Sequence, residues 1–359
     1  MTNHEFNHRR LELARQARGL TQAELAASLD ISQGRLSKME KGLCVVDAGL
    51  YDKLSTSLGY PPSFFQAPEH LYGMPLRYHR KKQSVPKREL DRVHAQVAIA
   101  CTHVQRLWEN VDIEQEHKLP RLDVDDHDDA VEEIARMVRG AWMLPRGPVD
   151  SVVARIEAAG IVVVEIDFGV SGLDAIGMRF PDPIPPVIFV SHSTPGDRMR
   201  FSLAHELGHL VMHTVPPENA AEVMEKQADR FAAEFLMPSE DVLPDLRHRR
   251  LDVARLGALK EYWRVAMTAL LGKAKTLGVV TERQARYLYV QMSSLGYRTR
   301  EPVKVEREVP SLISEILTTY QEDLEYSAAD IAALLALENR ELTKLYPIKS
   351  DTAQRLRLV

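Results

Sequence analysis

The sequence predicts an α+β fold that is mostly helical, in which an all-α head precedes a domain with a small β-sheet and a helical C-terminal region. Apolar residues recur at helical spacing through much of the chain. Short runs of β-branched and aromatic residues, bounded by Gly and Pro, lie between residues 161 and 190. With 359 residues, of which 45% are apolar, the chain is long enough for two or three domains.

The composition narrows the class of protein. A net charge of −5 argues against a chain that is basic throughout, so any contact with nucleic acid has to be local. Cys44 and Cys101 are far apart and form no C-x-x-C pair, which excludes a cysteine-based metal site and suits a reducing compartment. No apolar run approaches membrane-spanning length, and the first residues lack the core of a signal peptide. We therefore expect a cytoplasmic protein without membrane contact.

The first 66 residues carry the signals of several short helices. Thr21 and Glu24 fit a capping box, Ser32 can cap a later helix, and Gly19 and Gly42 follow expected helix ends. The expected helices cover residues 9–18, 33–41 and 48–58, with a short one directly after the capping box. Short helices joined by a turn of three or four residues predict a helix-turn-helix, whose second helix enters the major groove of DNA.

The run T-Q-A-E-L-A-A-S-L-D-I-S-Q-G-R-L-S-K-M-E-K-G resembles the XRE family of Cro and phage repressors, over about residues 9–65. The resemblance implies a DNA-binding head in which five side chains face the duplex: Gln33 and Lys38 at base edges, and Gln22, Arg35 and Lys41 nearer to phosphates.

Two features qualify this interpretation of the head. Gly34 stands where the family usually has a side chain, which predicts weak direct readout of sequence. The basic residues are mixed with acids and make no dense stripe, so helices that bind only protein are the alternative. A single helix-turn-helix usually needs a symmetric partner, and we therefore expect a homodimer on double-stranded DNA.

Residues 67–146 are expected to form a helical linker or dimerisation region. A helix from about residue 86 to residue 110 carries enough apolar residues at helical spacing to pack against a neighbouring helix or a second subunit. The acidic segment 123–129 lacks the glycine and the spacing of an EF-hand. We interpret it as an exposed segment that caps a helix over residues 130–143.

The stretch F-S-L-A-H-E-L-G-H places His205 and His209 four residues apart, and therefore on one face of a helix. Both imidazoles can then reach a single Zn²⁺, while Glu206 can reach a water on the metal without being a ligand itself. Two histidines on a polar helix face would match the same pattern. The surrounding residues are apolar, however, so the helix is expected to be buried, and buried histidines need partners.

The limits of this helix can also be predicted. Thr194 has a capping hydroxyl and is followed by Pro195, so the helix is expected to begin near Pro195 and to end at about His213. The H-E-x-x-H spacing of residues 205–209 is typical of zinc peptidases, which also need a donor for the oxyanion that forms at the substrate carbonyl. His213, Arg200 and Tyr262 are the candidates, and a His213 that only caps the helix end is the simpler alternative.

A third ligand is expected from the helix that contains E-K-Q-A-D-R-F-A-A-E-F-L-M-P. Glu225 and Asp229 share one face of this helix, so one can bind metal while the other orients a ligand histidine through its second ring nitrogen. We expect Glu225 to be the ligand and Asp229 the orienting residue, with Glu222 as the alternative ligand. A solvated helix face is the competing interpretation.

Together, R-F-S-L-A-H-E-L-G-H and E-K-Q-A-D-R-F-A-A-E-F-L-M-P resemble the ImmA/IrrE family of metallopeptidases, which are similar to gluzincins, over about residues 161–238. The resemblance implies a zincin-like domain in which His205, His209 and Glu225 hold Zn²⁺ and Glu206 is the general acid and base. Family members with a peptidase function cleave helix-turn-helix repressors in bacteria and their mobile elements.

Before the histidine helix, we expect a helix over residues 149–159 and then strands at 161–166, 175–180 and 187–190. They predict a small antiparallel or mixed sheet. In zinc peptidases an edge of such a sheet commonly holds the substrate as an added strand. The expected domains are a DNA-binding head at 1–66, the linker region at 67–146, a peptidase core at 147–240 and a helical accessory region at 241–359. The accessory region is expected to contain helices at 256–277 and 281–292 and two last helices.

The leading hypothesis is a bacterial DNA-binding regulator fused to a zinc endopeptidase, which removes a repressor in a stress or mobile-element response. The protein partner would then be a helix-turn-helix repressor. A second hypothesis is a transcription factor whose peptidase-like domain senses a metabolite or peptide without proteolysis. A third is the antitoxin of a toxin–antitoxin pair. Replacing Glu206 with Gln separates the first two, because only the first requires this carboxylate.

Overall fold

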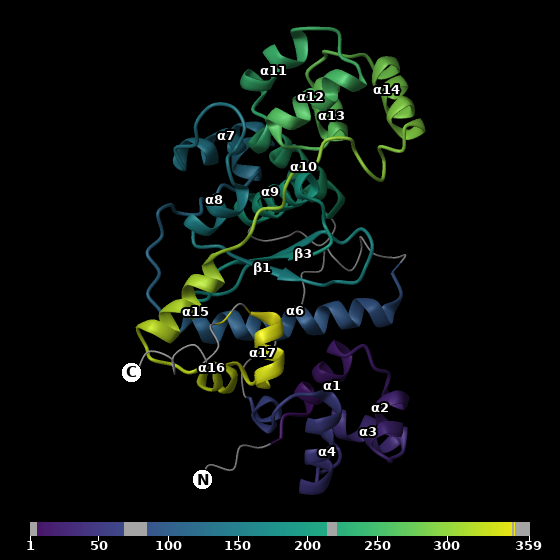
Figure 1. Ribbon diagram of the computed structural model, residues 1–359, viewed down its shortest axis with the longest axis vertical. Helices are drawn as coiled ribbons and strands as arrows, with labels where there is room; N and C mark the ends of the chain where they lie inside the picture. The colour runs from purple at the N-terminus through teal and green to yellow at the C-terminus, as the bar shows by residue number, and fades with distance from the viewer. Residues whose placement is uncertain (1–5, 68–84, 214–220, 347, 349–359) are drawn as a thin grey trace, which may run out of the picture. The chain divides into compact units, whose positions relative to one another are not determined.

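The computed structural model describes residues 6–67, 85–213, 221–346 and 348, and its chain divides into two compact units (Figure 1). Unit 1 combines residues 1–112 with 168–170 and 312–359, and unit 2 consists of residues 113–167 and 171–311. The predicted fold class is confirmed: 58% of the described residues are helical, and they include a small three-stranded sheet. Among the described helices, none is both long enough and apolar enough to span a membrane.

The head of unit 1 folds as its capping residues predict. Thr21 and Glu24 form the capping box, and Ser32 accepts a hydrogen bond from the backbone N–H of Arg35. A buried ion pair joins Arg15 to Glu40 with 2.5 Å between Nε and Oε1, so each buried charge has its partner. The elements are α1 (His8–Ala17), α2 (Gln22–Ser28), α3 (Gln33–Glu40), α4 (Ala48–Leu58) and the 3₁₀ helix η1 (Pro62–Gln66).

The long helix α6 (Lys87–Trp108) is the other main element of unit 1, and it packs against α1, α15 and α16. The expectation of two last helices is wrong, because the structure has α15 (Leu312–Glu322), α16 (Ala328–Leu335) and α17 (Asn339–Leu345). The break before α16 has a local cause: Ser327 and Asp330 form a capping box that starts a new helix. The start of the predicted linker falls in residues 68–84, outside the described residues.

Unit 2 is built on a mixed sheet with the strand order β1-β3-β2. β1 (Val162–Ile166) and β3 (Val187–Ser191) are parallel, and β2 (Ala175–Met178) pairs with β3 in the antiparallel direction at one edge. Two helices pack on the sheet: α8 (Val152–Ala158) on β1, and α9 (Gly196–Met212) on β2 and β3. The predicted sheet is therefore present in its mixed form.

Around α9, further helices complete the core of unit 2. α9 packs against α10 (Ala221–Leu236), and α10 packs against α7 (Val131–Ala141), which follows the 3₁₀ helix η2 (Asp125–His127). The expected acidic cap of α7 is wrong, because Ala130 precedes the helix without a side-chain cap. The expected Thr194 cap of α9 is wrong too: the Thr194 hydroxyl donates to Asp174, and Pro195 is the capping position.

The expected single helix over residues 256–277 is also wrong. The chain is broken at Arg264, which has a positive φ of 54°, and residues from elsewhere stabilise the break. Glu301 accepts the backbone N–H of Met267 and pairs with Lys260 of the preceding helix. The helices of this region are α11 (Ser239–Arg247), α12 (Val253–Trp263), α13 (Met267–Thr276) and α14 (Glu282–Ser294).

Candidate functional site

The facing sides of α9 and α10 bring His205, His209 and Glu225 together. The two Nε2 atoms lie 3.1 Å apart, His209 Nε2 lies 3.3 Å from Glu225 Oε1, and His205 Nε2 lies 3.6 Å from Glu225 Oε2. Ligands bound tetrahedrally to zinc at about 2.0–2.1 Å would be separated by roughly 3.3 Å. In the described part of the chain, these three residues are the group of His, Cys, Asp and Glu side chains whose ligand atoms all lie within 4.8 Å. They could hold one metal ion.

The close approach of α9 to α10 depends on a glycine. A Cβ atom on Gly208 would lie 2.9 Å from the ring of Phe231, so a larger residue would separate the two helices. Both histidines are buried in this contact, and the Glu225 side chain is 22% exposed. Glu225 therefore faces the histidine pair and not the solvent. The predicted alternative ligand, Glu222, is 84% exposed, pairs with Lys226 and lies outside the cluster.

Asp229 lies on the far side of the His205 ring from the cluster. Its Oδ1 is 2.8 Å from Nδ1 of His205, so the ring is held with Nε2 toward His209 and Glu225. Burial lowers the pKa of His205, but its hydrogen bonds with Asp229 and Glu225 outweigh this effect and raise the pKa to about 9. A metal ion at Nε2 would therefore have to displace a proton.

Glu206 lies against the edge of the sheet, beside the two histidines. Its Oε2 accepts a hydrogen bond of 2.8 Å from the backbone N–H of Gly177 in β2. The N–H of Ser191 in β3 donates to Asp174, and backbone groups alternate along a strand, so the N–H of Gly177 points away from β3. The carboxylate therefore lies on the side of β2 that faces away from β3. A Cβ atom on Gly177 would lie 2.9 Å from Oε2 of Glu206 and 3.2 Å from its Cβ.

The structure also shows partners of His209 that the sequence analysis did not identify. His213 Nδ1 lies 2.9 Å from His209 Nδ1, and His213 Nε2 lies 3.0 Å from Oε1 of Gln227. Gln227 in turn donates to Asp129, at 2.9 Å. The spacing of His213, four residues after His209 on one helix face, could have indicated this contact. Nothing in the local sequence indicates Gln227 or Asp129.

The other two candidate oxyanion donors have different surroundings. Arg200 is buried, donates to the carbonyl of Val149 and pairs with Glu308. Tyr262 is 56% exposed, and its hydroxyl lies close to Gly147. Neither residue belongs to the metal-ligand cluster of the described residues.

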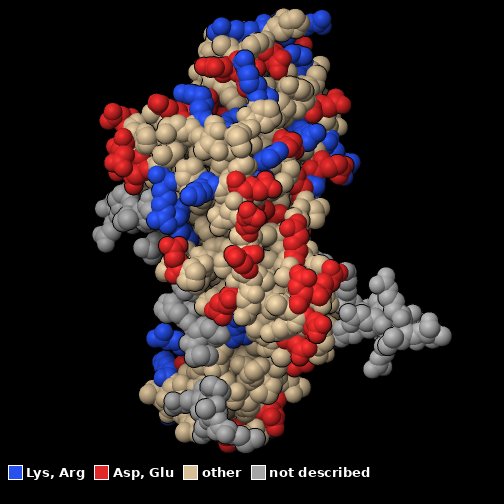
Figure 2. Space-filling view, turned by 90° about the vertical axis from the view of Figure 1, so that its left-hand side faces the viewer, with Lys and Arg blue, Asp and Glu red and all other residues tan. Residues whose placement is uncertain are grey.

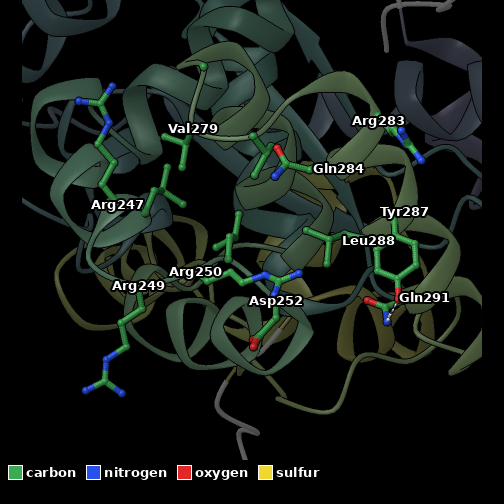
Figure 3. A pocket seen from close by; sticks show the side chains of 14 residues that line it. Arg247, Arg249, Arg250, Asp252, Val279, Arg283, Gln284, Tyr287, Leu288 and Gln291 are labelled. Carbon is green, nitrogen blue, oxygen red and sulfur yellow. Dashed lines mark hydrogen bonds between the residues drawn. The ribbon is translucent and has the colours of Figure 1, made fainter.

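Two cavities of unit 2 differ in their relation to the cluster. One, of about 650 Å³, is lined by Asp229 together with Phe201, Ser202 and Ala233, so it begins beside His205. The other, of about 770 Å³, shares no residue with the cluster (Figure 3). Its wall contains four arginines: Arg247, Arg249, Arg250 and Arg283. In Figure 3, Arg249 points away from the other labelled side chains.

In the head, the predicted DNA-facing residues lie on α2, α3 and the residue after α3. Gln33, Arg35, Lys38 and Lys41 are exposed, and Gln22 is half-buried. Gln22 donates to Glu40 of the buried ion pair at 2.7 Å, and Gln33 donates to Gln22 at 2.8 Å. Glu40 therefore fixes the amide of Gln22, which in turn fixes the amide of Gln33. On the face drawn in Figure 2, Lys and Arg side chains are interspersed with Asp and Glu.

Comparisons with known proteins agree with both halves of this description. Residues 11–65 match a family model described as a helix-turn-helix, and residues 156–275 match a peptidase family model described as the IrrE N-terminal-like domain. The chain joins an XRE-type helix-turn-helix to an IrrE/ImmA-like peptidase domain. A search of curated proteins found no match. The pair of domains supports a regulator that binds DNA and carries a metallopeptidase-like domain.

Proposed function

We propose that this protein is a transcriptional regulator whose peptidase domain is an active zinc endopeptidase and cleaves a helix-turn-helix repressor. The observation that carries the proposal is the meeting of His205, His209 and Glu225, with Glu206 beside them at the edge of the sheet. Two imidazoles and one carboxylate from separate helices form the donor set of catalytic zinc sites, which leave one coordination position for water or substrate.

The roles of the chain's own residues follow from their positions. His205, His209 and Glu225 hold the ion, and Asp229 orients His205. Bound zinc supplies Lewis acidity, which activates water for attack on a peptide carbonyl. Glu206 takes the proton from the attacking water and returns it to the departing amine as the C–N bond breaks. The N–H of Gly177 fixes one oxygen of this carboxylate.

The substrate would bind as an extended segment. The side of β2 that faces away from β3 lies beside Glu206, which supports pairing of a substrate strand with β2. The cavity next to Asp229 would receive a side chain of that segment, because its lining includes the partner of a ligand histidine. Such a segment is a loop or a locally unfolded part of the target. The head, as a homodimer on duplex DNA, would raise the local concentration of peptidase near DNA-bound repressors.

The test is proteolysis by the zinc-loaded protein of purified candidate repressors, compared with a Glu206→Gln variant. General acid–base catalysis contributes about 10²–10⁴-fold, so we expect the variant to lose cleavage by at least about 100-fold. Its zinc content and DNA affinity should stay unchanged. Regulation in cells that survives this substitution would instead support a peptidase-like sensor.

A further inference from the structure

A line of hydrogen bonds leads from His209 away from the candidate metal position. His209 Nδ1 contacts His213 Nδ1 at 2.9 Å, and His213 Nε2 contacts Oε1 of Gln227 at 3.0 Å. Nε2 of Gln227 donates to Oδ1 of Asp129 at 2.9 Å, and Arg230 pairs with the other oxygen of Asp129 at 2.7 Å. The line crosses from α9 through α10 to the segment before α7.

Only one direction of donation satisfies these three contacts together with a metal on Nε2 of His209. If His209 binds a metal through Nε2, its proton is on Nδ1, and it donates to His213 Nδ1. His213 must then carry its own proton on Nε2, which donates to the carbonyl oxygen of Gln227. The amide nitrogen of Gln227 then faces Asp129, whose carboxylate only accepts. His213 and Gln227 thereby each accept one hydrogen bond and donate the next, and the Asp129 carboxylate ends the line of hydrogen bonds.

We propose that His213, Gln227 and Asp129 are positioning residues that hold His209 in its metal-binding tautomer and orientation. This inference rests on the proposed zinc site. The two ligand histidines then have different hydrogen-bond partners. His205 contacts the carboxylate of Asp229 directly, whereas His209 reaches the carboxylate of Asp129 through two neutral residues, His213 and Gln227, which we call the relay. His213 thus has a place in the relay instead of a place at the oxyanion, because both of its ring nitrogens are engaged.

The relay has a structural reason. His209 is 1% exposed, so its Nδ1 proton needs a partner inside the protein. A carboxylate buried directly against it would carry a large desolvation cost. The relay places the charge on Asp129, which faces Arg230 near the surface, while the buried links stay neutral. Oriented hydrogen bonds of this kind also strengthen one another.

The direct test is the tautomer of His213 in the zinc-loaded full-length protein labelled with ¹⁵N-histidine. Two-bond ¹H–¹⁵N spectra identify which ring nitrogen carries the proton, and the His213 signals are assigned from their absence in a His213→Gln variant. We expect Nε2 of His213 to be protonated and Nδ1 to be an acceptor. A proton on Nδ1 of His213, or a doubly protonated ring at neutral pH, would overturn the proposal.

Metal affinity gives a second readout, measured by competition with a chelator. A partner of this type typically contributes 10–100-fold to affinity, so we expect His213→Leu to weaken zinc binding by about that factor. His213→Gln can both accept and donate, and it should restore most of the loss. Gln227→Met should weaken binding less, and its effect should not add to that of His213→Leu. The matched control is His192→Leu, at a histidine whose side chain is 59% exposed.

The outcomes also separate this inference from the proposed function. If the protein binds zinc and cleaves its substrate, but His213→Leu and His192→Leu have equal affinity for zinc, the relay is overturned and the proposed peptidase is not. A wild-type protein that takes up no zinc would overturn both. Circular dichroism of each variant shows whether a loss of affinity is simply a loss of fold.

Discussion

At the scale of single residues, the acids near the two ligand histidines show how the surroundings of a side chain decide its role. The pair at positions 205 and 209 was evident from the sequence, and so was a choice among three acids for the third ligand. Spacing alone could not decide that choice, because Glu222, Glu225 and Asp229 all lie near one side of the same helix. The structure separates them by their partners: Glu225 faces Nε2 of His205, Asp229 faces Nδ1 of the same ring, and Glu222 pairs with Lys226.

One prediction concerns Asp229. Replacing it with Asn keeps an acceptor for the Nδ1 proton of His205 but removes the negative charge, so we expect zinc affinity to fall by about 10-fold. Glu222→Gln is the matched control, since it removes an exposed acid from the same helix. Chelator competition on both variants measures the difference. Equal affinities in the two variants would show that Asp229 does not support the site.

A second prediction concerns the head. Gln33 is exposed at the start of α3, and its amide is oriented by Gln22. Gln33→Ala should weaken binding to the operator by about 1–3 kcal/mol while leaving binding to unrelated DNA unchanged, because a base contact carries sequence information. Gln16→Ala on α1 is the control, since that side chain bonds only locally to Glu12 in the described contacts. Fluorescence anisotropy with specific and random duplexes measures both effects.

At the scale of elements, β2 packs so closely on α9 that no side chain fits at Gly177 without moving Glu206. Gly177→Ala would place a methyl group 2.9 Å from the Glu206 carboxylate and break the geometry of its hydrogen bond. We expect cleavage to fall by at least about 10-fold while zinc affinity stays within about two-fold, because the atoms nearest to the added methyl group belong to Glu206, which is not a ligand. The control is Gly257→Ala in α12, where nothing lies within 4 Å of the added atom. An active Gly177→Ala variant would contradict the assigned role of this strand edge.

The elements also show why some of the fold could be predicted from sequence and some could not. The head was predictable because its capping residues act within three residues of one another, as Thr21 and Glu24 do. The break between α12 and α13 was not, because the carboxylate that stabilises it belongs to Glu301, more than 30 residues away. The cap expected at Thr194 failed for a similar reason, since Asp174 from another segment takes its hydroxyl.

At the scale of the whole molecule, the chain leaves unit 2 after residue 311 and ends in unit 1. This return could not be predicted from sequence, because amphipathic helices such as α15 and α16 show an apolar face but not which helix covers it. Within unit 1 they pack on α6. The relay partner Asp129 was missed for the same reason, as 98 residues separate it from Gln227.

Unit 1 should lose stability in mild acid because of His103 on α6. This ring is buried against the hydroxyl of Tyr346, and burial, with Arg106 and Arg10 nearby, lowers its pKa to about 3. The unfolded chain, with a pKa near 6.5, binds the proton more readily, so stability falls as the pH drops from about 6.5 toward 3. At pH 5, the titration of His103 lowers the free energy of unfolding by about 2 kcal/mol relative to its value at neutral pH.

This prediction can be checked by urea unfolding at pH 7 and pH 5, comparing wild type with His103→Gln. The variant should show the smaller loss of stability between the two pH values, because it removes the group that takes up the proton. Equal losses in the two proteins would indicate that His103 is not held neutral in the folded state.

The most direct test of the account is the zinc content of the full-length protein, followed as chelator is added. The wild type and Glu222→Gln should each retain one zinc ion per chain, whereas Glu225→Gln should release it at a chelator concentration at least about 10-fold lower. Zinc retained equally by all three proteins would contradict the assignment of Glu225. A wild-type chain that binds no zinc would contradict the proposed peptidase as a whole.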